Sequence, residues 1–515
     1  MSEHGARKWV IAGTVMIGNI MAVLDSSIVN VSLPDMAGNL GATIEEITWV
    51  VTGYILANVL IMPTVGMLSA RYSRKKLYLA SIALFTAASM LCGLARSLEV
   101  MVLWRVLQGL AGGVLVTVPQ AILRESFPLE EQGVAMGVYG MGVVLAPAIG
   151  PTLGGWITDQ YAWPWIFYIN VPVGIINLLM VQRLIEDPPY LERTKTSMDW
   201  AGLGCMVAGL GALQLMLEKG QEDDWFQSGF IIRLAVIAAL GMVLFVWREL
   251  VTRRPAVDLS ILRNIRFSAA TFLGGVMGAG LSGVLFILPL FLQNLLGYTA
   301  MRSGLTLMPR SLAMLVMMPI AGRLYNRLGP RLMVGGGLVL IAFGFWQLAH
   351  LTIDIGYWNL VWPQVWQGVG FSLLFAALST AALASVARER MTAATGLYNV
   401  VRQVMGSIGI AVAATLLTHS QATYHAVLAE NASGALGRQW LAATTMAMQT
   451  LGADFATARD RALQILDVRV SQQATVLSYN HIFLLVALLF MIVLPLVLLL
   501  QRSGHAEGEM ELIVD

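Results

Sequence analysis

The chain has 515 residues, of which 57% are hydrophobic and only 12% are charged, and its mean hydropathy is +0.72. Soluble domains carry about 25% charged residues, so this composition predicts a polytopic membrane protein and excludes a soluble globular one. The formal net charge of +2 and the scatter of basic residues between apolar runs give no sign of a nucleic-acid-binding surface. Cys92 and Cys205 both lie within apolar runs, which implies no disulfide framework.

About fourteen apolar runs are long enough to cross a membrane, since a span needs about 20 residues. In chain order they are 9–33, 46–70, 76–95, 99–123, 133–158, 164–184, 199–218, 229–250, 268–292, 302–325, 332–350, 360–386, 394–417 and 479–502. The sequence therefore predicts an all-α polytopic membrane protein.

Lys and Arg are distributed unevenly between alternate loops. One set of loops holds most of them, whereas the short loops of the other side and the adjoining span ends hold only Arg96, Lys219, Arg233 and Arg302. Cytoplasmic loops are enriched in Lys and Arg, so the first side is predicted to be cytoplasmic. Both termini are then cytoplasmic, which agrees with an even number of spans.

The connection between the last two spans, residues 420–478, is unusually long and rich in Ala and Gln. It is predicted to be extracytoplasmic, with a helix from about Asp454 to Gln473. Two interpretations are open: a solvated loop that caps a cavity, or a docking surface for a second protein.

The sequence contains an internal repeat. The loop GMLSARYSRK at Gly66 recurs as GRLYNRLGPR at Gly322, and AMGVY at Ala135 recurs as ATGLY at Ala394, at offsets of 256 and 259 residues. Two homologous halves of about six spans thus enclose an additional pair. Duplicated halves around a midplane site are typical of secondary transporters. We predict an N-terminal bundle at 1–190, two additional helices at 191–262 and a C-terminal bundle at 263–515.

These repeats carry a family resemblance. The loop at Gly66 resembles the cytoplasmic loop signature of the major facilitator superfamily. Arg105 with Gln108 and Gly109 resembles its fourth-span motif, and APAIGPTLGG, residues 146–155, resembles its fifth-span antiporter motif. The resemblance implies the major facilitator fold, two six-helix bundles plus two additional transmembrane helices.

Two further stretches, LDSSIVNVSLP at 24–34 and WIFYINVPVG at 165–174, resemble the fourteen-span drug/proton antiporter branch of the EmrB/QacA type. The EmrB type implies a periplasmic adaptor protein and an outer-membrane channel, and residues 420–478 suit such a partner. Relatives of the QacA type act without either.

The loop motif departs from the family pattern. Its usual Asp is Ala70 in the first copy and Asn326 in the second, and Ser73 replaces a usual Gly. These changes predict a weaker charge latch between the loop and its neighbours. The remaining gating candidates of the two loops are Gly66, Arg71, Arg74 and Arg327.

The fifth span supplies a second group of gating candidates. Gly150 and Gly154 continue a face of small residues that permits close helix packing, while Pro147 and Pro151 interrupt backbone hydrogen bonds. Ordinary tight packing is the alternative interpretation, and the family motif favours gating.

Asp25 is the least expected residue of the first span, because Asp in mid-membrane costs roughly 2.5 to 3.5 kcal/mol. At 1.5 Å per residue it lies ~12 Å from the outer end of its span, and Arg105 lies ~10 Å from the outer end of the fourth, so the two can meet. We predict that Asp25 carries a proton and that Arg105 tunes its affinity. A static buried ion pair that joins the two helices is the alternative.

Ion coupling is an adequate energy source, since one proton moving down 100 mV releases about 2.3 kcal/mol. The chain has no Gly-Lys dipeptide of a phosphate-binding loop and no HExxH or CxxC pattern. No cofactor, metal site or enzymatic activity is therefore expected.

Two more arginines, Arg310 and Arg402, occur in later spans, and each either lines a cavity or reaches toward an interface. In a cavity they would favour weakly acidic or neutral compounds, and Glu218 would offset their charge. The other candidate substrate-binding residues are polar, aromatic or Met side chains within spans: Asn19, Met21, Tyr54, Gln120, Gln293, Gln367, Tyr398 and Asn399.

The sequence thus predicts a proton-coupled exporter of hydrophobic small molecules in the bacterial inner membrane, in contact with lipid and without nucleic acid. A dedicated exporter of one metabolite or siderophore is the alternative, because the motifs indicate fold and coupling but not cargo. An intramembrane enzyme or receptor would not explain the two homologous halves.

Overall fold

The computed structural model describes residues 2–187, 199–252, 255–352 and 355–500. These residues form helices and no β-strand. The predicted boundary at 190/191 between the first bundle and the additional helices lies outside the described residues.

The N-terminal half contains six spans. Its helices are α1 (Ser2–Leu40), α2 (Ile44–Ile47), α3 (Trp49–Ile61), α4 (Val65–Tyr72), α5 (Arg74–Gly93), α6 (Leu98–Ser126), α7 (Gln132–Gln160), α8 (Trp165–Tyr168) and α9 (Asn170–Leu184). The second span comprises α2 to α4, and the sixth comprises α8 and α9. The additional pair is α10 (Trp200–Lys219) and α11 (Gly229–Val251).

The C-terminal half contains the other six spans in fewer, longer helices. They are α12 (Ile265–Leu290), α13 (Ala300–Leu348), α14 (Tyr357–Ala384), α15 (Met391–Ala432), α16 (Ala435–Thr450) and α17 (Phe455–Ile492). The described residues hold 13 helices long and apolar enough to cross a membrane. One of them, α13, contains a non-helical residue at Gly329 and comprises two predicted spans, so the fourteen-span prediction is confirmed.

The two copies of the loop motif share an unusual backbone conformation. Ser73 has φ 80° and ψ 143°, and Gly329, which is 256 residues later, has φ 71° and ψ 168°. This region suits Gly and is strained for a residue with a Cβ. The sharp turn between consecutive spans therefore explains why the family pattern has Gly where this chain has Ser73.

The two halves pack tightly at the end of the molecule that carries these loops. A Cβ on Gly137 of α7 would lie 2.6 Å from the Met318 carbonyl oxygen, and a Cβ on Gly396 of α15 would lie 2.4 Å from the Met62 carbonyl oxygen. These contacts are related by the sequence repeat, because Gly137 precedes Gly396 by 259 residues and Met62 precedes Met318 by 256 residues. The halves are therefore closed against each other at this end.

The first and last described spans both end near these loops. Lys8 of α1 forms an ion pair with Glu131, in the connection between α6 and α7. Arg331, just after the turn at Gly329, donates through Nε to the Leu500 carbonyl at 2.6 Å. The first and last spans thus end on one side, as an even number of spans requires.

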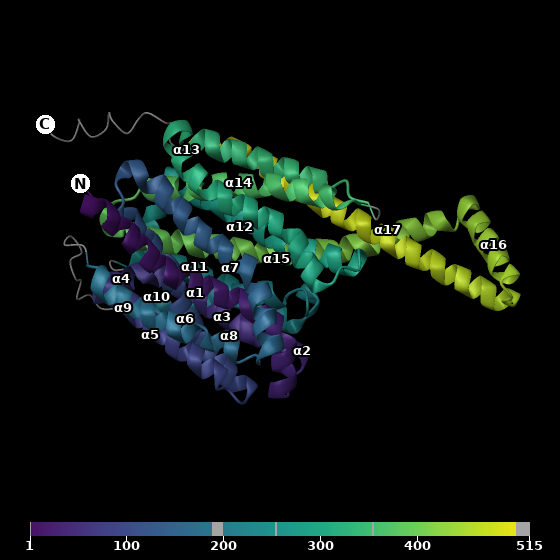
Figure 1. Cartoon of the computed structure of the whole chain (residues 1–515), viewed down its shortest axis with the longest axis horizontal. Helices are drawn as coiled ribbons and strands as arrows, with labels where there is room; N and C mark the ends of the chain where they lie inside the picture. Colours follow the sequence, from purple (N-terminus) through teal and green to yellow (C-terminus); the bar gives the residue numbers. More distant parts are fainter. Residues whose placement is uncertain (1, 188–198, 253–254, 353–354, 501–515) are drawn as a thin grey trace.

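Residues 420–478 are largely helical and project from the bundles as an arm, formed by the end of α15, α16 and the start of α17 (Figure 1). The predicted helix over 454–473 is present, since Asp454 caps α17 by accepting from the Thr457 amide at 3.1 Å. The interpretation as a loop that caps a cavity is wrong, because two long helices carry the segment away from the bundles instead of across them.

The close contact between the halves gives a first prediction. Gly137→Ala and Gly396→Ala should each separate the loop ends, because the new Cβ would overlap a backbone oxygen of the other half. Spin labels at Tyr72 and Arg388, both exposed, should move apart in pulsed electron resonance measurements. Gly204→Ala is the control, since a Cβ there meets nothing within 4 Å. An unchanged distance in both test variants would refute closure through these glycines.

Candidate functional site

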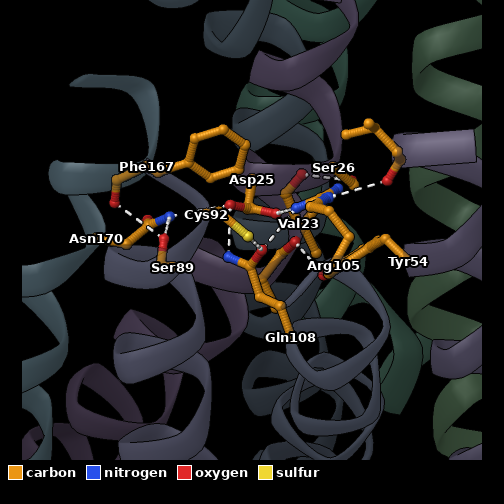
Figure 2. A network of polar contacts seen from close by, with 12 residues as sticks. Val23, Asp25, Ser26, Tyr54, Ser89, Cys92, Arg105, Gln108, Phe167 and Asn170 are labelled. Atoms are coloured by element: carbon orange, nitrogen blue, oxygen red, sulfur yellow. Dashed lines mark hydrogen bonds and ion pairs between the residues drawn. The ribbon is translucent and has the colours of Figure 1, made fainter. Parts of the chain in front are cut away.

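Asp25 and Arg105 form a buried ion pair in the N-terminal bundle. Asp25 is 1% exposed and Arg105 is fully buried, and Arg105 Nη1 contacts Asp25 Oδ2. The sequence placed these two side chains at similar depths on α1 and α6, and the structure brings them together (Figure 2). The carboxylate is held within protein and away from lipid, as the cost of a charge in hydrocarbon requires.

The second carboxylate oxygen of Asp25 is occupied by two amides. Gln108 donates from Nε2 at 2.9 Å and Asn170 donates from Nδ2 at 3.0 Å, both to Asp25 Oδ1. Asn170 also donates to Ser89 Oγ at 3.0 Å, and Ser89 donates to the Phe167 carbonyl. The network therefore joins α1, α5, α6 and α9 around one carboxylate (Figure 2).

Arg105 is fixed by contacts beyond its ion pair. Its Nε donates to the Val50 carbonyl at 3.0 Å and its Nη1 donates to Gln108 Oε1 at 2.8 Å. The Tyr54 ring lies 4.3 Å from the guanidinium carbon, and the Tyr54 hydroxyl donates to the Ala22 carbonyl at 2.9 Å. Only Nη2 is buried without a partner. The guanidinium is therefore pre-positioned against the carboxylate.

Sequence reasoning missed three members of this network. Gln108 was recognised within the fourth-span motif but not as a ligand of Asp25, and Ser89 and Asn170 were not selected. The only available signal was that Asn170 is a lone amide in the apolar run WIFYINVPVG. A single polar residue in a span does not reveal which neighbour it faces, so the contacts required the fold.

The antiporter motif packs directly on the helix that carries Asp25. A Cβ on Gly150 would lie 2.7 Å from Ser27 Oγ, and a Cβ on Gly154 would lie 2.7 Å from Ile28 Cγ1. The helix α7 continues through Pro147 and Pro151 without a break. Small residues therefore serve close packing of α7 on α1, two to three residues from Asp25.

The gating candidates in the two loops differ in their surroundings: some are buried in contacts and others are exposed. Arg74 is buried and forms an ion pair with Glu125 at the end of α6, which joins the first loop to the fourth span. Gly66 faces α15, since a Cβ there would lie 2.6 Å from Ala393 Cβ. Arg71 lies over the Tyr72 ring at 5.5 Å, and Arg327 is exposed. In the second loop Asn326 donates to the Glu130 carbonyl across the halves.

The predicted substrate-binding residues lie in several places instead of one pocket. Gln120 of α6 and Asn399 of α15 meet between the halves, where Asn399 donates to Gln120 Oε1 at 2.8 Å. Arg402 donates to Asn399 Oδ1 at 3.3 Å. Tyr398, which precedes Asn399 in the sequence, is buried, and its hydroxyl has no hydrogen-bond partner. This group lies at the interface of the two halves.

The remaining candidates are scattered. On α1, Met21 is buried in the apolar core and Asn19 is buried with both amide atoms unpartnered. Glu218 of α10 is half-buried and accepts from Gln214 at 2.9 Å. Gln293 is exposed in the π-helical turn that follows α12. Arg310 and Gln367 are buried between α13 and α14.

The sequence matches the family model described as Major Facilitator Superfamily over residues 15–410. The chain belongs to the major facilitator superfamily. It is 36% identical to the fatty acid resistance protein FarB of Neisseria gonorrhoeae, over 95% of each chain. It is 33% identical to the multidrug export protein EmrB of Escherichia coli strain K12, over 98% of each chain.

The fold agrees with this membership. The proton:xylose symporter XylE superposes with a TM-score of 0.61 over 99% of each chain at 11% sequence identity. At that identity the likeness concerns the fold alone. The resemblance of the sequence to the EmrB-type branch is confirmed by the full-length similarity to EmrB and FarB.

The ion pair gives a stability prediction. Arg105→Gln should lower the melting temperature of the purified protein, because an isolated buried carboxylate remains, and losing one partner of a buried pair costs about 3 to 5 kcal/mol. The double variant Asp25→Asn with Arg105→Gln should recover part of the loss, since it removes both charges. Exposed Arg96→Gln is the control. A double variant that melts below Arg105→Gln would contradict this account.

Proposed function

We propose that this protein exports hydrophobic small molecules across the bacterial inner membrane by alternating access, in exchange for protons that bind Asp25. The observation that carries the proposal is the fully buried pair of Asp25 and Arg105 in a chain of this superfamily. A carboxylate needs a changing environment to take up and release a proton, and a guanidinium that approaches or withdraws supplies one. The relatives whose names denote export or resistance support efflux as the direction.

The contacts of Asp25 suggest how a proton would alter the structure. The carboxylate accepts from Arg105, Gln108 and Asn170, and protonation removes its charge and one acceptor position. Arg105 keeps the Val50 carbonyl and Gln108 Oε1 as acceptors. The attraction between α1 and α6 therefore weakens while the guanidinium stays in place. Because α1 packs on α7, a shift of α1 reaches the contact between the halves.

The predicted orientation places both termini and the loop motifs in the cytoplasm and the arm in the periplasm. Under this orientation the closed end is cytoplasmic, and the structure corresponds to a conformation that does not open to the cytoplasm. The basic residues of the loops support the orientation through the positive-inside rule.

Coupling is tested directly in proteoliposomes with an imposed proton gradient. Asp25→Asn should abolish proton-driven efflux of a lipophilic dye and the associated proton flux at normal protein level, because the amide cannot exchange a proton. Asp35→Asn is the matched control, since Asp35 is exposed on the same helix. Full dye and proton flux in Asp25→Asn would show that the ion pair only joins the helices and does not carry the proton.

We also propose that the arm is the docking surface for a periplasmic adaptor that connects to an outer-membrane channel. The arm projects from the bundles and exposes large apolar side chains, among them Met446 at 65%, Leu451 at 87% and Phe455 at 60%. Exposed apolar groups on a projecting element are typical of protein contacts.

The arm is tested by replacing its apolar tip. Leu451→Glu with Phe455→Glu should stop co-purification of the adaptor, because charged groups would replace the exposed apolar contact. Dye efflux by the purified protein in vesicles should persist, since the arm lies away from the ion pair. Gln449→Glu, which adds charge nearby without removing an apolar group, is the control. Unchanged co-purification of the double variant would exclude the tip as the contact.

A further inference from the structure

The C-terminal bundle contains a buried arginine without a carboxylate. Arg310 lies on α13, about 15 Å along the helix from its first residue, and is 2% exposed. Its Nη1 has no hydrogen-bond partner, and none of the ion pairs between described residues includes it. Between residues 265 and 417 the only acidic residues are Asp354 and Glu389, both outside the apolar runs. The spans of this bundle therefore supply no countercharge.

Unpartnered amides lie on the helix that packs against Arg310. Gln364 and Gln367 of α14 are fully buried. Gln364 Nε2 donates to the Thr306 carbonyl at 2.8 Å and to the Leu360 carbonyl at 3.0 Å, which leaves only its Oε1 without a partner. Both amide atoms of Gln367 have no partner. A Cβ on Gly368 would lie 2.6 Å from the Arg310 carbonyl oxygen, so the two backbones are in direct contact. An unpaired guanidinium and an unpaired amide, that of Gln367, thus occur on contacting turns of two helices.

The repeat shows what this arrangement lacks. In the N-terminal half a Cβ on Gly109 would lie 2.3 Å from the Tyr54 carbonyl oxygen, which is the same contact between the equivalent helices. Arg310 follows Tyr54 by 256 residues, and Gln364 and Gln367 follow Arg105 and Gln108 by 259.

In the N-terminal half, the guanidinium of Arg105 and the amide of Gln108 both contact Asp25. The C-terminal half has a guanidinium and amides on the same pair of helices, but no carboxylate. Burying an unpaired charge is costly, and a charge that persists in a membrane span commonly marks a binding or transport site. A countercharge for Arg310 would therefore have to come from outside the spans of this bundle.

We propose that Arg310, with the free amide nitrogen Nε2 of Gln367, binds the carboxylate of an acidic lipophilic cargo. This rests on the proposed export function and specifies its substrate class. A guanidinium presents two parallel N–H groups that match the two oxygens of a carboxylate. A neutral or cationic compound of the same shape leaves the guanidinium unpaired.

Binding is tested with the full chain in lipid nanodiscs by calorimetric titration of 4-butylbenzoate and of 4-butylbenzamide, which has the same shape without the charge. The acid should bind about ten- to a hundredfold more tightly, as a charged hydrogen-bonded pair is worth about 1.5 to 3 kcal/mol. Arg310→Gln should remove this preference. Arg302→Gln should keep it, since Arg302 is exposed on the same helix over the Tyr298 ring.

Equal binding of the two compounds to the wild type, or a preference for the acid that survives in Arg310→Gln, overturns the proposal. Without ligand, Arg310→Gln should melt no lower than the wild type, because it removes an unpaired buried charge. A lower melting temperature would show that Arg310 stabilises the fold through contacts within the protein, which would contradict the proposal. Stabilisation of the wild type by sodium chloride alone, lost in Arg310→Gln, together with no acid preference, would assign the site to an inorganic ion.

Proton-driven efflux of neutral Nile red by the wild type separates this inference from the export function. If Nile red is exported and the acid has no advantage in binding, only the carboxylate site is refuted. If the wild type exports neither Nile red nor 4-butylbenzoate under a proton gradient, the export function itself fails.

Discussion

The absence of water from the bilayer core is the constraint on which this structure depends. A charge that enters a span needs a partner from the protein or from a bound ligand, because hydrocarbon offers none. Asp25 meets this requirement with three donors from α6 and α9, and Arg105 meets it with the carboxylate, two carbonyl-type acceptors and an aromatic ring. The pair and its amide partners therefore hold α1, α6 and α9 together.

Continuous contacts connect this pair to the boundary between the halves. Asp25 lies on α1, whose Ser27 and Ile28 pack on the glycines of α7. Nearer the start of α7, Gly137 packs on the Met318 backbone in the other half. One helix, α7, thus contacts both the helix that carries Asp25 and the opposite bundle. Under the proposed mechanism, a movement of α1 would reach the interface between the halves through these contacts.

The additional helices take part in the same interface. Gln214 of α10 donates to Ser407 of α15 at 2.8 Å, and Lys219 donates to Thr48, just before α3, at 2.8 Å. The helix α10 therefore bonds to both halves, beyond its role as a connection in the chain. Glu218 lies between Gln214 and Lys219 on α10. A half-buried carboxylate is therefore present on the helix that bonds to both halves.

The sequence by itself determined the fold class, the fourteen spans, the repeat and the meeting of Asp25 with Arg105. Hydrophobic length and internal similarity are properties of the chain, and a charge in a span stands out against its neighbours. It did not determine that Ser89, Gln108 and Asn170 complete the network, that Gln293 is exposed, or that residues 420–478 form a projecting arm. Those outcomes depend on helix rotation and on packing between distant segments. Local composition does not encode them, so only the tertiary structure decided them.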